Sequence, residues 1–248
     1  MIDVSSFPLT AWQTPRFLQL ETVGSTNDAL KASGWSTPFA TVLSTHQTAG
    51  KGRRGRTWLG APRESLAMSV LLPQRGAGAS APSWIPLLVG VAVVSSLREV
   101  GVSDASLKWP NDVLISGKKL AGILCEALPS GEIIAGIGLN IIFSGYPPAP
   151  LATSLAEQGL VDGTTVDGLV SKIVKHLKKM VSLSSEEVLE SARAVMMTLG
   201  LTVEVVEADG TRWTGSAHDL NAEGLLAVRD QSGVNRLLAA ADVEHLYQ

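Results

Sequence analysis

Cysteine is almost missing from this sequence, which has Cys125 alone among 248 residues. One cysteine cannot form an intramolecular disulfide, and it leaves no cysteine cluster for a structural zinc site. This scarcity favours a reducing compartment. Cys125 falls in an expected buried strand, so we interpret it as a core residue and not as a nucleophile. The histidines are scattered and predict no metal site or catalytic base: His46, His176, His218 and His245.

An excess of positive charge is also missing. The chain has 20 Lys and Arg against 23 Asp and Glu, which gives a net charge of -3. A basic module that lives on nucleic acid normally shows a clear cationic excess, so wholesale nucleic-acid binding is disfavoured. We therefore expect no DNA partner.

Long apolar runs are absent as well. The most apolar stretch, residues 85–94, is too short to span a bilayer and runs into Ser95, Ser96 and Arg98. Residues 1–17 lack both the basic and the continuous apolar region of a secretory signal. We expect a cytoplasmic protein with no membrane partner.

The composition is that of a globular protein. Hydrophobic residues make up 45% of the chain and charged residues 17%, which suits a substantial buried core. The length allows one main domain and a small appendage.

Short β-rich segments and longer helical ones alternate through the first 200 residues, which predicts an α+β domain with an antiparallel or mixed sheet. Strands are expected at 17–21, 39–45, 65–72, 106–109, 113–115, 119–127 and 132–140. A helix is expected to start at 25–31, and others to occupy 84–100, 166–183 and 186–199.

The chain changes character after Gly200. About fifty residues of short strands and turns follow, at 201–207, 211–219, 225–230 and 234–239. This pattern indicates a small β-barrel or sandwich appended to the α+β domain. We place the two domains at residues 1–198 and 199–248.

Positive charge is concentrated in one glycine-punctuated segment, residues 50–56, which contains Lys51, Arg53, Arg54 and Arg56. Glycines let the backbone approach a ligand closely, and guanidinium groups suit phosphate or carboxylate oxygens. The segment is typical of a loop that closes over an anion. A solvated basic loop or a nucleic-acid patch is the alternative.

Residues 108–112, Lys-Trp-Pro-Asn-Asp, form a second motif. Its simplest interpretation is a turn, because proline fixes φ and Asn-Asp satisfies nearby backbone groups. In the functional interpretation, the Asp112 carboxylate binds Mg²⁺ or a ribose hydroxyl, and Lys108 is directed at phosphate.

Further signals have both structural and functional interpretations. Lys118 is typical of an exposed edge, whereas Lys119 precedes small residues that open space for a ligand. Gly136 and Gly138 alternate in a strand, as at a bulge or at a close approach of a ligand. Ser25 and Thr26 can either cap a helix or bind a ligand.

Five motifs in this order, at residues 24–27, 47–58, 108–112, 119–124 and 136–140, resemble biotin protein ligase. The resemblance spans about residues 20–140. It implies a class II synthetase-like mixed sheet with helices on one side, and the β-rich tail is similar to that family's small SH3-like C-terminal barrel. The implied activity joins biotin and MgATP into biotinyl-5'-AMP with release of pyrophosphate. Biotin then passes to one lysine of a biotin carboxyl carrier domain.

The resemblance also assigns residues. Biotin would be bound by Ser25, Thr26, Gln47, Gly50, Lys51, Lys119, Gly122, Gly136 and Gly138. The nucleotide would be bound by Lys51, Arg53, Arg56, Trp58, Lys108, Asn111, Asp112 and Asn140. Lys119, Arg53 and Arg56 would be catalytic, and Asp112 is a candidate Mg²⁺ ligand. The physics agrees, since a carboxylate that approaches a triphosphate needs cations to offset their repulsion.

Two departures from the family pattern stand out. Lys51 replaces an arginine often found at its position, which keeps the charge but loses the bidentate fork. The stretch before Phe17 is too short for the winged-helix domain of some bacterial members, so we expect a ligase only, as a monomer or weak homodimer. The alternatives are a lipoate or octanoate ligase or transferase of the same superfamily, and a nucleic-acid-binding module.

Overall fold

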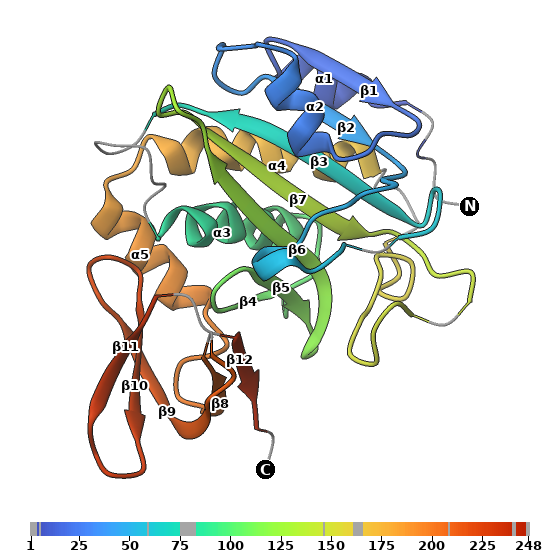
Figure 1. The fold of residues 1–248 in the computed structure, drawn as a ribbon. Helices are drawn as coiled ribbons and strands as arrows, with labels where there is room; N and C mark the ends of the chain where they lie inside the picture. The colour runs from blue at the N-terminus through green and yellow to red at the C-terminus, as the bar shows by residue number, and fades with distance from the viewer. Residues whose placement is uncertain are drawn as a thin grey trace.

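The computed structural model describes residues 4, 6–58, 60–74, 83–145, 147–160, 166–207, 209–239 and 242–246. This part of the chain contains two β-sheets, five α-helices and one short 3₁₀ helix at Arg53–Gly55. The large sheet has the order β1-β2-β3-β7-β6-β5-β4 (Figure 1). Only its β1–β2 pair is parallel, so the predicted mixed sheet is confirmed. Its strands are β1 (Phe17–Leu20), β2 (Thr41–Ser44), β3 (Ser65–Leu72), β4 (Ser106–Lys108), β5 (Asp112–Ile115), β6 (Lys118–Ala127) and β7 (Ile133–Asn140).

One face of this sheet forms the main core. Side chains alternate along a strand, so Leu66, Met68 and Val70 of β3 point to the same side, where they join the buried cluster that contains α3 (Ile85–Glu99). Two helices, α4 (Val166–Val181) and α5 (Ser185–Val195), pack against α3. The predicted long core helix is therefore confirmed, within one residue at each end.

Helix α2 (Thr26–Ala32) corrects one expectation, because the helices do not all lie on one side of the sheet. Its Leu30 packs with Leu71 and Ile134, which lie on the face opposite α3 and form a second, smaller cluster. Strands β3 and β7 are buried on both faces of the sheet and carry apolar side chains on each face. The second face can therefore also be covered by a helix. Consequently α2 begins on the second face of the sheet.

Helix α5 is shorter than predicted. It starts with a capping box between Ser184 and Glu187, but it ends at Val195, not at residue 199. The backbone N–H of Met197 donates to the carbonyl of Leu107 at 2.8 Å, so the chain leaves the helix to pair with β4. Tertiary pairing outweighs the helical pattern at this point.

Helix α1 (Pro8–Gln13) has no counterpart among the predicted elements. The buried Asp167 carboxylate accepts from the backbone N–H of Leu9 at 2.7 Å, and from the N–H and hydroxyl of Thr10 at 2.8 and 2.7 Å. A side chain from α4 thus satisfies the backbone donors at the start of this short helix.

The second sheet is antiparallel, in the order β11-β10-β9-β8-β12 (Figure 1). Its strands are β8 (Thr202–Val206), β9 (Arg212–Leu220), β10 (Leu226–Asp230), β11 (Asn235–Leu238) and β12 (Asp242–His245). In the described residues β11 and β12 do not pair with each other, so this sheet is open at both edges. Its core is continuous with that of the large sheet, and the Trp109 indole N–H donates to the Gly224 carbonyl at 3.2 Å. Within the described ranges, no helix is long and apolar enough to cross a membrane.

Cys125 lies on β6, where it is partly buried and packs against the main core. Burial raises the pKa of its thiol to about 12, with the nearby Glu126 charge a smaller cause. A thiol with such a pKa is a poor nucleophile, which agrees with the interpretation of Cys125 as a core residue.

Candidate functional site

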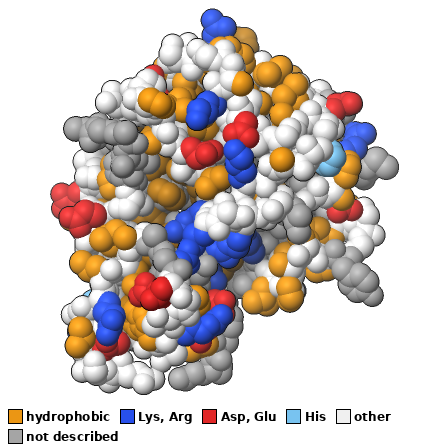
Figure 2. Space-filling model, in the orientation of Figure 1, with side chains coloured by type: hydrophobic (Ala, Val, Ile, Leu, Met, Phe, Trp, Pro, Cys, Tyr) orange, Lys and Arg blue, Asp and Glu red, His pale blue; other side chains and the backbone are white. Residues whose placement is uncertain are grey.

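A cavity of about 360 Å³ lies on the face of the large sheet opposite α3. Its wall also includes the start of α2, the basic loop and four residues of the second sheet, Val206, Arg212, Val243 and Glu244. Figure 2 shows Lys and Arg side chains gathered on the surface around this hollow, between the two sheets. The volume is typical of small-molecule sites.

The floor of the cavity is a row of small residues that strand register sets side by side. Ala67 on β3 faces Gly138 on β7, Gly138 faces Gly122 on β6, and Gly122 faces Asp112 on β5. A Cβ atom added to Gly138 would lie 2.4 Å from the Trp58 ring, and one added to Gly122 would lie 3.0 Å from it. The glycines therefore create the space in which the Trp58 indole lies flat on the sheet.

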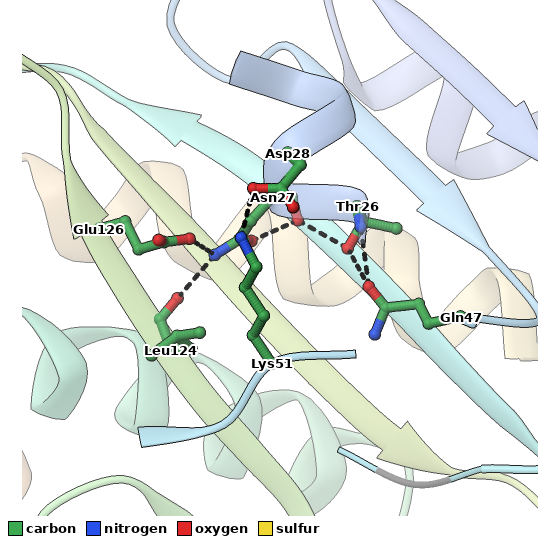
Figure 3. A network of polar contacts seen from close by, with 8 residues as sticks. Thr26, Asn27, Asp28, Gln47, Lys51, Leu124 and Glu126 are labelled. Carbon is green, nitrogen blue, oxygen red and sulfur yellow. Dashed lines mark hydrogen bonds and ion pairs between the residues drawn. The ribbon is translucent and has the colours of Figure 1, made fainter. Parts of the chain in front are cut away.

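The inner end of the cavity is polar (Figure 3). Gln47 Oε1 accepts from the Thr26 backbone N–H at 2.7 Å and lies 3.2 Å from its hydroxyl. The Ser69 hydroxyl lies 2.8 Å from the Thr26 hydroxyl and 2.6 Å from Asn27 Oδ1. These groups form a buried network that can recognise hydrogen-bonding groups of a ligand.

Ser25 occupies the N-cap position of α2, as the helix-capping interpretation predicts. In the described structure its side chain forms no capping hydrogen bond, and the residue is buried in the cavity wall. The backbone role is present, and the hydroxyl remains available to a ligand.

At the opposite side of the floor, the Lys119 ammonium lies 2.7 Å from Asp112 Oδ1. This contact is an ion pair, but its geometry is not that of a hydrogen bond to Oδ1. Lys119 also lies 5.8 Å from the centre of the Trp58 ring, and Lys108 lines the same region. This end of the cavity can bind anionic oxygens.

The basic loop is folded over the cavity as a tight hairpin. The Gly52 N–H donates to the Arg56 carbonyl at 2.7 Å, and the Trp58 N–H donates to the Gly50 carbonyl at 3.0 Å. Arg53 donates to the Asn111 side chain at 3.2 Å. A turn with left-handed backbone at Arg54 (φ 56°) directs this side chain outward, where it donates to the Val206 carbonyl at 3.4 Å.

Lys51 has a different environment from the other basic residues of the loop. Its ammonium lies 2.6 Å from Asp28 of α2, and the two side chains are 45% and 53% exposed. The hydrogen bond to Asp28 raises the pKa of Lys51. Lys51 lines the cavity but points to α2 in Figure 3.

Most of the residues predicted for the site come together here. Those that line the cavity are Ser25, Thr26, Gln47, Lys51, Arg53, Arg56, Trp58, Lys108, Asn111, Asp112, Lys119, Gly122, Gly136 and Gly138. Two residues predicted for the site, Gly50 and Asn140, do not line the cavity in the described structure. Gly50 backs Gln47 and Trp58, and the buried Asn140 amide donates to the carbonyls of Lys119 and Thr153 at 3.3 and 3.0 Å.

Other residues of the wall were missed. Asn27 directly follows Ser25 and Thr26, so its neighbours were a usable signal. The four wall residues of the second sheet carry no local motif, because only the packing of that sheet brings them to the cavity.

The donor set for a metal is small. In the described part of the chain, no group of three or more His, Cys, Asp or Glu side chains could hold a metal ion. Asp112 offers one carboxylate, whose buried Oδ1 is in the ion pair with Lys119 at 2.7 Å. That suits Mg²⁺ bound mainly by nucleotide phosphates and water, and does not suit a cage of protein ligands.

Comparison with known proteins identifies relatives. A sequence model of the biotin/lipoate A/B protein ligase family matches residues 20–141. The biotin--[acetyl-CoA-carboxylase] ligase of Mycobacterium tuberculosis is 34% identical over 232 residues, which cover 90% of this chain and 86% of that protein. The bifunctional ligase/repressor BirA of Bacillus subtilis is 28% identical, over 82% of this chain and 65% of the relative.

Solved structures are similar over nearly the whole chain. The biotin protein ligase of Aquifex aeolicus, in complex with biotin and ATP, has a TM-score of 0.76 and 27% identity, over 94% of this chain and 100% of that chain. The enzyme of Leishmania major, in complex with biotinyl-5-AMP, has a TM-score of 0.65 and 30% identity, over 91% and 99% of the two chains.

Proposed function

The chain belongs to the biotin protein ligase family, and from this premise we propose that it is an ATP-dependent ligase that attaches biotin to a lysine of a carboxylase carrier domain. One observation carries the proposal. A single cavity joins a buried polar end, a glycine floor on which the Trp58 ring lies, and a cationic end. These three parts suit the ureido ring, the hydrocarbon body and the carboxylate of biotin, next to a nucleotide.

In the first half-reaction, a biotin carboxylate oxygen attacks the α-phosphorus of ATP and pyrophosphate leaves. Ser25, Thr26 and Gln47 hold the ureido ring at the inner end. The ring system lies beside Gly122, Gly136 and Gly138, which leave room for the Trp58 and Asn27 side chains that bound it. Lys119 then stands beside the carboxylate and offsets its repulsion from the phosphates.

The nucleotide is proposed to bind at the cationic end. The residues proposed to contact it are Lys51, Arg53, Arg56, Trp58, Lys108, Asn111 and Asp112. Asn140, also assigned to the nucleotide, acts from behind the wall by donating to the Lys119 carbonyl. MgATP is the substrate form, and Asp112 would supply a carboxylate to its Mg²⁺. The closed loop at residues 50–58 excludes water from the mixed anhydride that forms.

In the second half-reaction, the amine of the carrier lysine attacks the acyl carbon of biotinyl-5'-AMP. An amide bond forms, AMP leaves, and the lysine gives up a proton. Loop residues Arg53 and Arg56 hold the AMP phosphate until the amine arrives.

The finer architecture is also proposed. Residues 1–198 would be the catalytic domain and residues 199–248 an SH3-like domain, whose strand β12 and strand β8 contribute to the cavity wall. A monomer or weak homodimer without a DNA partner, in the cytoplasm, stays our prediction.

Biotin-dependent exchange of labelled pyrophosphate into ATP tests the first half-reaction. We expect exchange with biotin and Mg²⁺, and little exchange with lipoate or octanoate. Exchange with lipoate in place of biotin would instead support a lipoate ligase. Absence of exchange, together with steeply salt-dependent binding of oligonucleotides, would support a nucleic-acid-binding module.

A further inference from the structure

Glu126 on β6 ends the buried polar network at the inner end of the cavity (Figure 3). Its Oε2 lies 2.5 Å from Asn27 Nδ2. The network then continues through Asn27 Oδ1, Ser69 Oγ and Thr26 Oγ1 to Gln47 Oε1. Glu126 does not appear in the cavity wall among the described residues, so its hydrogen-bonded connection to a ligand runs through these groups. Its charge also contributes to the raised pKa of Lys51, after the larger effect of Asp28.

The two amides in this network have fixed orientations. Gln47 Oε1 accepts from the Thr26 backbone N–H at 2.7 Å, so its oxygen faces Thr26. A carboxylate only accepts hydrogen bonds, so Glu126 requires the Asn27 NH₂ group and turns Asn27 Oδ1 toward Ser69. The Leu124 carbonyl, 3.5 Å from Asn27 Nδ2, is at the limit of a hydrogen bond and contributes less.

With both ends fixed as acceptors, the hydrogens can be counted. The network contains three oxygen–oxygen contacts: Gln47–Thr26, Thr26–Ser69 and Ser69–Asn27. Only two hydrogens are available for them, one from the Thr26 hydroxyl and one from the Ser69 hydroxyl. Among the described residues, one contact is therefore without a proton. The two hydrogens can be placed in three ways, and these leave an acceptor open on Gln47, Thr26 or Asn27, respectively. All three residues line the cavity, so a donor from the cavity can fill the open position.

We propose that Glu126 is a positioning residue that makes the inner end of the cavity require an N–H donor from its ligand. If Asn27 turned its amide around, its NH₂ group would face Ser69, supply the third hydrogen and close the network on itself. The carboxylate at position 126 prevents this. The inference rests on the proposed function, in which the ureido N–H of biotin is the donor.

The same arrangement has a consequence for specificity. A ligand whose ring has no N–H group, such as the dithiolane of lipoate, leaves the buried acceptor without a partner. A site built to hydrogen-bond a ligand rejects analogues that lack the group far more strongly than an apolar site does. Glu126 thereby contributes to the choice of biotin over lipoate.

Glu126→Gln tests the proposal, because glutamine has the same shape but can either donate to Asn27 or accept from it. The readout is a discrimination ratio: the Kd of a biotin analogue with oxygen in place of both ureido N–H groups, divided by the Kd of biotin, by titration calorimetry. In the unaltered protein we expect a ratio of at least about 100. In Glu126→Gln the ratio should fall about tenfold, while the Kd for ATP changes less than about twofold.

The double variant Asn27→Asp/Glu126→Gln exchanges the amide and the carboxylate. The carboxylate introduced at position 27 would again present an acceptor to Ser69, and it would accept from the NH₂ group of the glutamine introduced at position 126. We expect this variant to recover the discrimination ratio to within about threefold of the unaltered protein. Asp28→Asn is the matched control, since it removes a neighbouring carboxylate whose described partner is Lys51, and its ratio should not fall.

General damage to the site would raise both Kd values and leave their ratio unchanged. An unchanged ratio in Glu126→Gln, or a double variant no better than Glu126→Gln, would overturn the role of Glu126 while the unaltered protein still bound biotin. An unaltered protein that bound ATP but not biotin would overturn the proposed function itself.

Discussion

At the scale of single residues, the cationic end of the cavity depends on neighbours in sequence that have different surroundings. Lys118 and Lys119 are adjacent on β6, but only Lys119 lines the cavity and pairs with Asp112. Successive side chains point to opposite faces, and a register shift between β5 and β6 brings Lys119 to the same face as Gly122. Lys119 can therefore take part in the reaction while Lys118 remains a solvent-exposed residue at the sheet edge.

Lys119→Ala should lower the rate of pyrophosphate exchange about 100- to 1000-fold, because it removes a positive charge that stabilises the negative charge developing in the transition state. The free energy of unfolding should change by less than about 1 kcal/mol, because the ion pair is 37% and 24% exposed at its two ends. Exchange assays and urea denaturation measure the two effects.

Lys118→Ala is the matched control, and it should keep both the exchange rate and the stability. Equal losses of exchange and stability in Lys119→Ala would mean that Lys119 is structural.

At the scale of elements, two adjacent arginines of the basic loop have different surroundings. Arg53 lines the cavity and donates to Asn111, whereas Arg54 does not line the cavity and donates to the Val206 carbonyl. The left-handed turn at Arg54 produces this division. Retention of the adenylate should therefore depend on the first arginine more than on the second.

Arg53→Gly should release biotinyl-5'-AMP from the site, so that labelled biotin appears on bulk protein such as serum albumin. We expect at least about tenfold more of this label than with the unaltered protein, from a loss of roughly 1.4 kcal/mol in adenylate binding. Arg54→Gly, which relieves a left-handed residue outside the cavity, should leak no more than the unaltered protein. Equal leakage from the two variants would remove the proposed holding role of Arg53.

Helix α1 gives a second prediction at this scale. Asp167→Ala removes acceptors from three donors at the start of α1, in a buried position. The free energy of unfolding should fall by about 2–4 kcal/mol, measured by urea denaturation. Thr10→Val, which keeps both backbone bonds, should cost about 1 kcal/mol. A loss below about 1 kcal/mol in Asp167→Ala would contradict the capping role.

The strands and helices that could be predicted from the sequence are those with strong local patterns. Helix α3 has an apolar run of helical length ended by Gly101, and β7 has a β-rich run bounded by turns. Helix α1 could not be predicted, because its cap lies 157 residues away at Asp167. The end of α5 could not be predicted either, since pairing with Leu107 decides it.

The same division applies to the site. The cations and glycines could be found because each lies in a motif with a local physical meaning, and register then lines up Gly138, Gly122 and Asp112. The part played by Glu126 depends on which way an amide turns, which the sequence does not specify. The contribution of the second sheet depends on tertiary packing alone.

At the scale of the whole molecule, His245 connects the last strand to the turn at Trp109. Its Nε2 lies 3.1 Å from the Thr198 hydroxyl, which accepts from the Trp109 N–H at 3.0 Å. Burial lowers the pKa of His245 to about 4, and the Lys108 charge is a smaller cause in the same direction. The folded protein therefore holds a neutral imidazole that is protonated in the unfolded chain below pH 6.5.

This shift predicts a pH dependence of stability. Because the folded pKa is lowered, the contribution is complete above pH 6.5 and is lost as the pH falls from 6.5 to about 4. The free energy of unfolding should decrease by up to about 1.4 kcal/mol per pH unit in this window. Urea denaturation at about pH 7, 5.5 and 4.5 measures the slope.

His245→Gln should flatten the slope, whereas His218→Gln, on the exposed side of β9, should follow the unaltered protein. Glu99, whose pKa is lowered from 4.5 to about 2 by Lys172 and His176, acts from about pH 4.5 downward and so overlaps only the acid end of this window. An unchanged slope in His245→Gln would show that His245 does not carry the effect.

The central claim is that one cavity makes the adenylate and hands biotin to a carrier lysine. Its most direct test is transfer of labelled biotin to the purified carrier domain of an acetyl-CoA carboxylase, with ATP and Mg²⁺. We predict label on the carrier lysine, no label without ATP, and little competition from a large excess of lipoate. Absence of label with biotin, together with transfer of lipoate under the same conditions, would contradict the account.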